Sequence, residues 1–438
     1  MDRSFKNILV LLACVVFVNV LCGICPAGEL KAGCAKIDIT PPVGVWLSGY
    51  ASRNKPSDGI LDPLYAKALV LDDGDSKMAI VSADLLWVPL EMTGQVRKVV
   101  KTKLGIAEEN LLICGTHTHF GPKLDRPTKN WPDAADSKVD AAYVASLQGK
   151  LIEVIVKAHG DMRSAKLGMT KGQAPELVYN RRTRKPDGTV AMTFKLPPAD
   201  PNLTFGPTDP QVTILKVEDS DGKLLAALVN FACHPVSGDG NAEKFYSISA
   251  DYPGYTAQVV EQVEGGLCFF ALGTAGNINP VRLGWANPRL QAGRALGAEV
   301  LRRLQFVSTT GQVRLSGLNK TISLPLKRDL PADRVTDTDK DKESITTEIQ
   351  ILRIGDIYIL GLPGEVLVEI GLDIRQRSGI EKLFIISLSN DGCGYVCPRE
   401  AYKEGGYEPG SGTNLAEGAG EIVTEEALEL LRQMQQSK

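Results

Sequence analysis

The sequence predicts an α/β protein in which a mixed β-sheet forms the core and helices flank it. Three pairs of apolar segments are each joined by a short polar turn, which is the pattern of β-hairpins. Segments with the length and periodicity of amphipathic helices lie between these pairs, and this alternation is typical of α/β folds. No low-complexity linker divides residues 28–438, so we expect one large domain.

The strands can be placed in chain order. The first, at residues 32–39, ends at a Thr-Pro-Pro sequence, because proline cannot continue a β-ladder. The hairpins pair residues 66–71 with 78–83, 212–217 with 225–232, and 349–354 with 357–362. A polar residue follows each hairpin, namely Asp84, His234 and Glu365. Although polar residues commonly follow strands, this recurrence predicts a functional site at the C-terminal ends of the strands.

Helices are expected between the hairpins and after them. The segments with helical length and periodicity are residues 90–104, 138–158, 254–263, 288–304, 366–376 and 424–434. Gly105 and Gly160 stop the first two, since glycine readily adopts the left-handed conformation that ends a helix. The polar stretch 327–343 lacks this periodicity and predicts a surface insertion.

The N-terminus predicts a secretory signal peptide over residues 1–27. Two basic residues precede an apolar run at 8–25, and residues 25–27 (Cys-Pro-Ala) offer a small-residue cleavage site. Cleavage would make the mature protein secreted or periplasmic. The alternative is an uncleaved segment that anchors the protein in a membrane, since 18 mostly apolar residues nearly span a bilayer.

Composition and charge narrow the class of function. The chain of 438 residues is 43% hydrophobic and 23% charged, which is ordinary for a globular protein. Its net charge of −3 leaves no basic footprint, so we expect no nucleic-acid partner, and no protein partner is indicated. Cys393 and Cys397 are close enough in sequence to pair in an oxidising compartment, but the spacing alone leaves that open.

Two of the four histidines form a His-x-His pair within Thr116-His117-Thr118-His119. An apolar run at 111–114 leads into them and a Gly-Pro break follows, as expected for a buried strand that delivers two imidazoles to a pocket. Side chains at i and i+2 of a strand share a face, and two nitrogen donors supply half of a zinc site. The alternative is a pair of histidines in a surface turn.

Further metal ligands can come from His234 and Glu365. A zinc hydrolase usually has three protein ligands and an open position for water. His234 follows the second hairpin, and Glu365 follows a Pro-Gly turn after the third. The alternatives are a hydrogen-bonded core histidine and a first-turn glutamate that the helix dipole favours.

Several motifs occur in a fixed order along nearly the whole mature chain. They are Ala-Lys-Ile-Asp-Ile-Thr-Pro-Pro at 35–42, Ser-Gly-Tyr at 48–50, 63–71, 81–84, Thr-His-Thr-His-Phe-Gly-Pro at 116–122, 180–181, 232–235, 248–254, 363–365 and 394–402. Together they resemble the N-terminal catalytic domain of the neutral/alkaline (non-lysosomal) ceramidase family. The resemblance implies a hydrolase with a zinc ion (Zn²⁺) as cofactor. Its substrate would be ceramide or a related N-acyl sphingolipid, reached through transient contact with a membrane surface.

The resemblance also implies a role for individual residues. The zinc ligands would be His117, His234, Glu365 and Tyr395. His119 would be the general base toward the attacking water, and an imidazole with a pKa near neutral is suited to that task. Arg181 and Tyr407 would face the oxyanion that develops in the transition state.

Two features depart from the family pattern. In Gly-Asn-Ile-Asn-Pro at 276–280, Asn279 stands where the family has a serine assigned to the catalytic site. We therefore expect no serine hydroxyl in the reaction, and we expect Asn279 to hydrogen-bond the substrate instead. The chain ends at Lys438 after one further helix, so the family's C-terminal β-sandwich domain is expected to be absent.

Three functions follow from these observations. The first is a secreted zinc hydrolase that cleaves an amide such as N-acyl-sphingosine. The second is a zinc hydrolase acting on a different amide or an ester, for example one derived from a carbohydrate. The third is a non-catalytic binding protein that retains the fold, and the presence of every expected ligand disfavours it.

Overall fold

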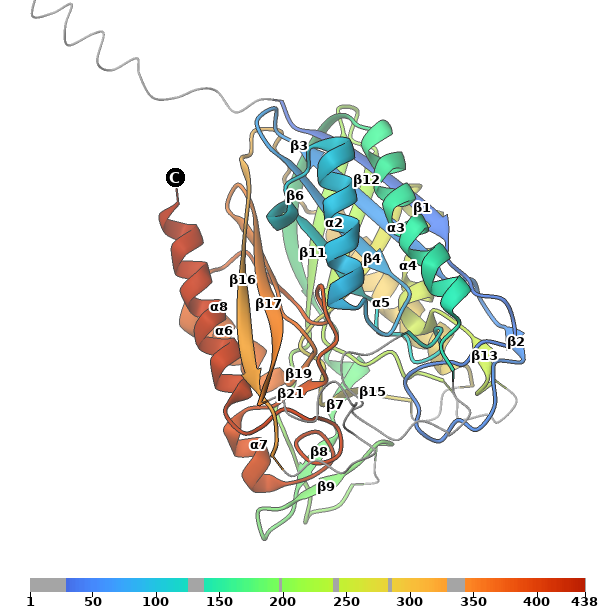
Figure 1. Ribbon diagram of the computed structural model, residues 1–438, viewed down its shortest axis with the longest axis vertical. Helices are drawn as coiled ribbons and strands as arrows, with labels where there is room; N and C mark the ends of the chain where they lie inside the picture. The colour runs from blue at the N-terminus through green and yellow to red at the C-terminus, as the bar shows by residue number, and fades with distance from the viewer. Residues whose placement is uncertain are drawn as a thin grey trace, which may run out of the picture.

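The computed structural model describes residues 29–124, 138–196, 199–238, 244–282, 286–328 and 343–437. These residues form four layers, in which two β-sheets stack on each other and helices cover their outer faces (Figure 1). The mixed α/β class is confirmed, and the core holds two large sheets rather than one. The expected signal peptide and positions 329–342 of the expected insertion lie outside the described residues.

The larger sheet has eight strands in the order β14-β12-β11-β6-β1-β3-β4-β5. They are β1 (Lys31–Asp38), β3 (Tyr65–Asp72), β4 (Lys77–Ala83), β5 (Leu111–Gly115), β6 (Arg163–Gln173), β11 (Gln211–Asp219), β12 (Leu224–Phe231) and β14 (Leu267–Leu272). Neighbouring strands are antiparallel except for two parallel pairs, β4 with β5 and β12 with β14. The first and second predicted hairpins are β3–β4 and β11–β12.

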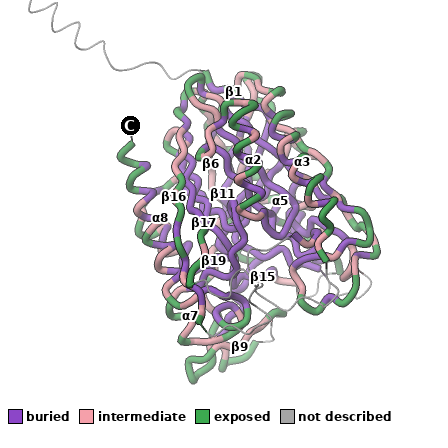
Figure 2. Tube along the Cα trace, viewed as in Figure 1, coloured by how far each residue is buried: buried purple, intermediate pink, exposed green. Residues whose placement is uncertain are grey.

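Both faces of this sheet are covered. The helices on its outer face are α2 (Leu90–Leu104), α3 (Ala141–Gly160), α4 (Asp251–Glu264) and α5 (Pro288–Leu304). In β3, Ala66, Ala68 and Val70 pack toward these helices, while Leu69 and Leu71 face the second sheet. Residues 68–71 of the strand are therefore all apolar, as expected for a strand buried on both sides. Figure 2 shows the strands buried in the interior and the exposed residues on the outer helices.

The smaller sheet has four strands in the order β16-β17-β18-β20. They are β16 (Leu315–Pro325), β17 (Ser344–Ile354), β18 (Ile357–Gly361) and β20 (Leu383–Ile386). Leu352 and Phe384 on its inner face pack against Ile80 and Leu112 of the larger sheet. Two helices cover its outer face, α6 (Val368–Ser378) and α8 (Ala419–Gln436). None of the helices in the described ranges is long and apolar enough to cross a membrane.

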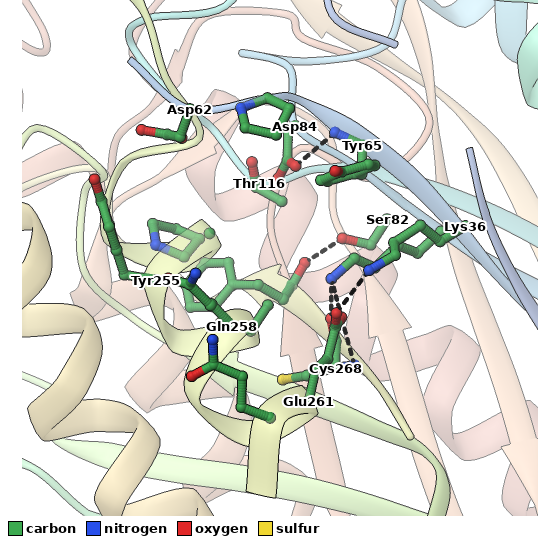
Figure 3. Close-up of a pocket in the computed structure, with 17 residues that line it drawn as sticks. Lys36, Asp62, Tyr65, Ser82, Asp84, Thr116, Tyr255, Gln258, Glu261 and Cys268 are labelled. Carbon is green, nitrogen blue, oxygen red and sulfur yellow. Dashed lines mark hydrogen bonds and ion pairs between the residues drawn. The ribbon is translucent and has the colours of Figure 1, made fainter. Parts of the chain in front are cut away.

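The two edges of the larger sheet approach each other. Lys67 on β3 donates to the carbonyl oxygen of Cys268 on β14 at 2.6 Å, and Ser82 on β4 donates to that of Phe270 at 2.6 Å. Glu261 on α4 joins the same contact, because its carboxylate pairs with Lys67 at 2.6 Å and with Lys36 at 2.8 Å (Figure 3). The loops that follow β4 and β5 are thereby brought close to those that follow β12 and β14.

Replacing Glu261 with glutamine is expected to lower the free energy of unfolding by roughly 2–4 kcal/mol, because it removes the carboxylate that pairs directly with the buried Lys67 ammonium. The Lys67 side chain is only 9% exposed. As a control, Glu153→Gln removes a surface pair with Lys157 in which Glu153 is 50% exposed, and it should change stability by less than about 1 kcal/mol. Urea denaturation measures both, and equal effects would contradict a structural role for Glu261.

Several short elements surround the ends of the large strands. They are β2 (Gly59–Ile60), β7 (Val178–Asn180), β8 (Arg182–Arg184), β9 (Val190–Met192), β10 (Thr204–Phe205), β13 (Ser247–Ile248), β15 (Ile278–Pro280), β19 (Glu365–Val366), β21 (Tyr395–Val396) and α7 (Arg399–Glu404). Two pairings matter for the site. Glu365 of β19 lies opposite Tyr395 of β21, and Asn279 of β15 lies opposite Tyr179 of β7. Backbone pairing thus joins segments that are far apart in the sequence.

Candidate functional site

The histidine pair follows β5 in a tight turn rather than in the strand. The amide of Thr116 donates to the carbonyl of Ala83 at 2.8 Å, and that of His117 donates to Leu85 at 2.9 Å. His117 has a φ of 69°, in the left-handed region that non-glycine residues rarely adopt. The prediction that strand alternation orients the two imidazoles is therefore wrong. The turn brings them together, with His119 Nε2 lying 3.3 Å from His117 Nε2.

His117 and His234 converge on the carboxylate of Glu365. Their Nε2 atoms lie 3.2 and 3.1 Å from its Oε2. Each Nδ1 donates to a backbone carbonyl, His117 to Leu86 at 3.0 Å and His234 to Ala275 at 2.6 Å. A carbonyl can only accept, so a neutral imidazole here carries its proton on Nδ1 and directs the Nε2 lone pair toward Glu365.

Burial sets the protonation of these groups. It lowers the pKa of His234 to about 4 and that of His119 well below its ordinary value. Burial would raise the pKa of Glu365, but the nearby His117 and His234 hold it well below the usual range. His119 and His234 are therefore neutral and Glu365 is charged, as metal binding requires of its ligands.

This donor set fits a divalent cation. His117, His119 and His234 are fully or almost fully buried, and one ligand atom from each lies within 4.8 Å of the others. In the tautomer with Nδ1 protonated, the Nε2 lone pairs of His117 and His234 would face a carboxylate oxygen, and a cation would relieve their repulsion. Imidazole and carboxylate together are the usual donors for zinc.

Tyr395 lies beside this group. Its ring stacks on that of His234 with 6.5 Å between centroids and 16° between planes. Its hydroxyl accepts a hydrogen bond from Arg181 Nη2 at 3.0 Å. The expected ligands His117, His234, Glu365 and Tyr395 therefore belong to one buried cluster.

Arg181 is held by three partners. Besides Tyr395, it donates from Nε to Glu408 Oε1 at 2.8 Å and from Nη1 to Asn279 Oδ1 at 3.2 Å. The second oxygen of Glu408 accepts from Arg182 at 2.8 Å. Although burial opposes the charge of Arg181, Tyr395 and Glu408 raise its pKa above the ordinary value. Glu408 was not predicted from the sequence, where its only signal is its place directly after Tyr407.

A cavity of about 420 Å³ opens onto the site. The predicted residues that line it are His119, Arg181, Asn279, Tyr395 and Tyr407. The Tyr407 ring packs against that of Tyr395 with 5.5 Å between centroids and lies 5.8 Å from the Arg181 guanidinium. All four expected catalytic residues therefore face the same space.

Gly49 and Tyr50 position His119, and neither was predicted to do so. A Cβ at Gly49 would lie 2.5 Å from Cγ of His119, so no larger residue fits against this imidazole. Tyr50 packs edge-on against the same ring with 5.1 Å between centroids. The Ser-Gly-Tyr motif at 48–50 was the available signal.

A second cavity of about 350 Å³ opens beside Thr116, and Figure 3 shows its lining. Burial raises the pKa of Asp62 and Asp84 there to about 6. None of the predicted ligands or catalytic residues lines it. The chemistry described above belongs to the first cavity.

Comparisons with known proteins match this chain to neutral ceramidases. A family model described as "Neutral/alkaline non-lysosomal ceramidase, N-terminal" matches residues 30–269. A protein named neutral ceramidase from Mycobacterium tuberculosis is 21% identical over 83% of this chain and 70% of its own length. A neutral ceramidase from Drosophila melanogaster is 26% identical over 56% of this chain and 34% of its own length. The crystal structure of neutral ceramidase from Pseudomonas aeruginosa superposes with a TM-score of 0.75 at 21% identity, covering 92% of this chain and 75% of that one.

Proposed function

The chain belongs to the neutral/alkaline non-lysosomal ceramidase family, and from this premise we propose that it is a zinc-dependent amidohydrolase. It would cleave the N-acyl bond of ceramide or a related N-acyl lipid. The observation that carries the proposal is the convergence of His117 and His234 on Glu365, at 3.2 and 3.1 Å, beside a cavity lined by His119 and Arg181. Secretion or export to the periplasm, expected from residues 1–27, is part of the proposal.

Four residues would hold the metal, namely His117, His234, Glu365 and Tyr395. When bound, zinc supplies Lewis acidity, which polarises an acyl carbonyl and makes water more acidic. The backbone carbonyls that accept from Nδ1 of His117 and His234 orient both imidazoles. Such outer partners fix the tautomer and raise the basicity of a ligand.

His119 would act as the general base. Burial keeps its imidazole unprotonated, and its Nδ1 has no hydrogen-bond partner among the described residues. The ring lines the cavity and is held by Gly49 and Tyr50. It can therefore take the proton of the attacking water and return it to the leaving amine.

Arg181 and Tyr407 would stabilise the charge that develops on the acyl oxygen. Arg181 is fixed by Glu408, Asn279 and Tyr395, so little reorganisation is needed when the charge appears. Asn279 uses its side-chain oxygen to orient Arg181 and its amide to donate to the carbonyl of Phe194 at 3.2 Å. A serine hydroxyl is not required for either task.

Apolar side chains would receive the acyl chain. The cavity is lined by Tyr50, Phe120, Phe194 and Phe245, and Phe194 is 46% exposed. An exposed aromatic side chain at such a site supports transient contact with a lipid surface. The volume of about 420 Å³ lies toward the lower end of the roughly 300–1,000 Å³ typical of small-molecule sites.

A substrate panel tests the proposed reaction. The purified protein is incubated with N-dodecanoyl-sphingosine, other N-dodecanoyl amines, N-acetylglucosamine and a dodecanoyl ester, and free amine, acid or alcohol is measured by mass spectrometry. We expect the N-acyl lipids to be hydrolysed at least roughly tenfold faster than the sugar or the ester. Hydrolysis of the sugar or ester alone would favour the second function. No hydrolysis of any substrate would favour a binding protein.

A further inference from the structure

We propose that the substrate carries an anionic group, a carboxylate or phosphate, on its amine portion, and that Arg282 binds this group. The inference rests on the proposed function, because, among the N-acyl lipids proposed for the same cavity, it selects those with an anionic amine portion over neutral ceramide. It is carried by the guanidinium of Arg282, which lines the cavity, is fixed by backbone carbonyls and pairs with no described carboxylate.

The described residues that line this cavity include several cationic side chains and no carboxylate. The cationic residues that line it are Arg181, Lys195, Lys244, Arg282 and Arg289. Glu408 pairs with Arg181, and Asp251 lies 3.5 Å from Arg289. No carboxylate within the described ranges lies at ion-pair distance from Arg282. No described carboxylate therefore neutralises the charge of Arg282.

Arg282 is held in place by backbone carbonyls and by no described carboxylate. Its Nη1 donates to the carbonyl oxygens of Val236 at 2.8 Å and Gly238 at 2.9 Å, and its Nη2 donates to that of Phe194 at 3.0 Å. A guanidinium has five N–H donors, so two of them have no partner among the described residues. Carbonyl oxygens satisfy hydrogen bonds but leave the full positive charge. A fixed guanidinium with spare donors suits a carboxylate or phosphate, which it can bind through two hydrogen bonds.

Arg53 adds positive charge behind aromatic side chains that line the cavity. It is 3% exposed and stacks on Tyr50, Phe120 and Phe245, with 4.8–5.1 Å between its guanidinium carbon and the ring centroids. Its hydrogen bonds go to the carbonyls of Ser48 and Phe245, and no described carboxylate pairs with it. Burial keeps water away from this charge, so it attracts an anion in the cavity more strongly than a surface arginine would.

The position of Arg282 indicates which part of the substrate is charged. Arg282 Nη2 and Asn279 Nδ2 donate to the same carbonyl oxygen, that of Phe194. Asn279 in turn contacts Arg181, which would face the acyl oxygen. The anion would therefore sit near the scissile amide, as in the N-acyl derivative of an amino acid or of an amino-alcohol phosphate, and not at the far end of the acyl chain.

Matched substrates test this inference. N-dodecanoylglycine is compared with neutral N-dodecanoylglycinamide, and N-dodecanoylethanolamine phosphate with neutral N-dodecanoylethanolamine. In the wild-type protein we expect kcat/KM to be roughly 10- to 100-fold higher for a charged substrate than for its neutral partner. Arg282→Gln should lower this ratio to near one, chiefly by raising KM for the charged substrate, while Arg282→Lys should retain part of it. The control Arg294→Gln, an exposed arginine on α5, should keep the wild-type ratio.

The outcomes separate this inference from the proposed function. A wild-type protein that hydrolyses neutral N-acyl amides as well as charged ones, with the ratio unchanged in Arg282→Gln, overturns the anion site alone. Absence of hydrolysis of any N-acyl amide overturns the proposed function. In that case, calorimetry still tests the anion site, since N-dodecanoylglycine should bind the wild-type protein at least tenfold more tightly than the Arg282→Gln variant. Equal affinities would contradict it.

Discussion

Replacing Glu365 with glutamine is expected to abolish turnover and to release the metal. The carboxylate is approached by Nε2 of His117 at 3.2 Å and of His234 at 3.1 Å, and it supplies the negative charge of the site. Glutamine has nearly the same shape but is neutral, and its amide would donate to one of the imidazoles. Loss of an outer partner of a metal ligand typically costs 10- to 100-fold, so we expect loss of this ligand to cost more than about 100-fold in kcat/KM.

The measurement combines metal content with kinetics. Zinc bound per chain is determined by mass spectrometry alongside kcat/KM for an N-acyl lipid. Glu381→Gln serves as the control, because Glu381 is exposed and forms no ion pair among the described residues. A Glu365→Gln protein that keeps both its zinc and its activity would show that Glu365 is not a ligand.

Replacing His119 with glutamine is expected to lower kcat by roughly 10²- to 10⁴-fold while zinc stays bound. The reason is that His119 lines the cavity and can accept a proton, whereas His117 and His234 converge on Glu365 behind it. KM should change little, since the other residues that line the cavity would supply most of the substrate contacts, while His119 would act on the attacking water. Metal content and the separate values of kcat and KM distinguish this variant from Glu365→Gln.

A different result for His119→Gln would revise the ligand set. The Nε2 atoms of His117 and His119 are 3.3 Å apart, and both histidines belong to the group that could hold an ion. If the variant loses zinc together with activity, His119 is a ligand and the base lies elsewhere. If the His119→Gln variant keeps full turnover, His119 is neither the general base nor a metal ligand.

Local patterns predicted much of the fold. The segments 90–104 and 288–304 coincide with α2 and α5, because their amphipathic periodicity matches helices that cover one face of a sheet. The other four predicted helices begin or end within five residues of the observed bounds. The hairpins could be placed because each is closed by a turn only a few residues long.

Long-range pairing could not be predicted from these patterns. The strand β16 pairs with β17 along its whole length, although its sequence Leu-Ser-Gly-Leu-Asn-Lys-Thr-Ile-Ser-Leu-Pro mixes polar and apolar residues without a long apolar run. This pairing and that of β18 with β20 create the second sheet. A sequence read segment by segment shows that a strand exists but not which strand lies beside it.

The candidate site, like the fold, could be predicted only in part from the sequence. Resemblance to a family pointed to eight residues, and the structure brings them into one region. Their orientation depends on features with no pattern of their own, such as the left-handed φ of His117 and the carbonyls of Leu86 and Ala275 that face the imidazoles. Glu408 was missed because a buried glutamate that fixes an arginine looks, in sequence, like any glutamate in a loop. All six cysteines in the described ranges are free, including Cys393 and Cys397, whose pairing the spacing left open.

The central claim is that hydrolysis depends on a metal held by His117, His234, Glu365 and Tyr395. The most direct test measures zinc per chain and N-acyl lipid hydrolysis in the same purified wild-type protein before chelation, after chelation and after zinc is returned. We expect about one zinc per chain, loss of nearly all activity with the metal and recovery of both together. A metal-free protein with full activity would contradict the account.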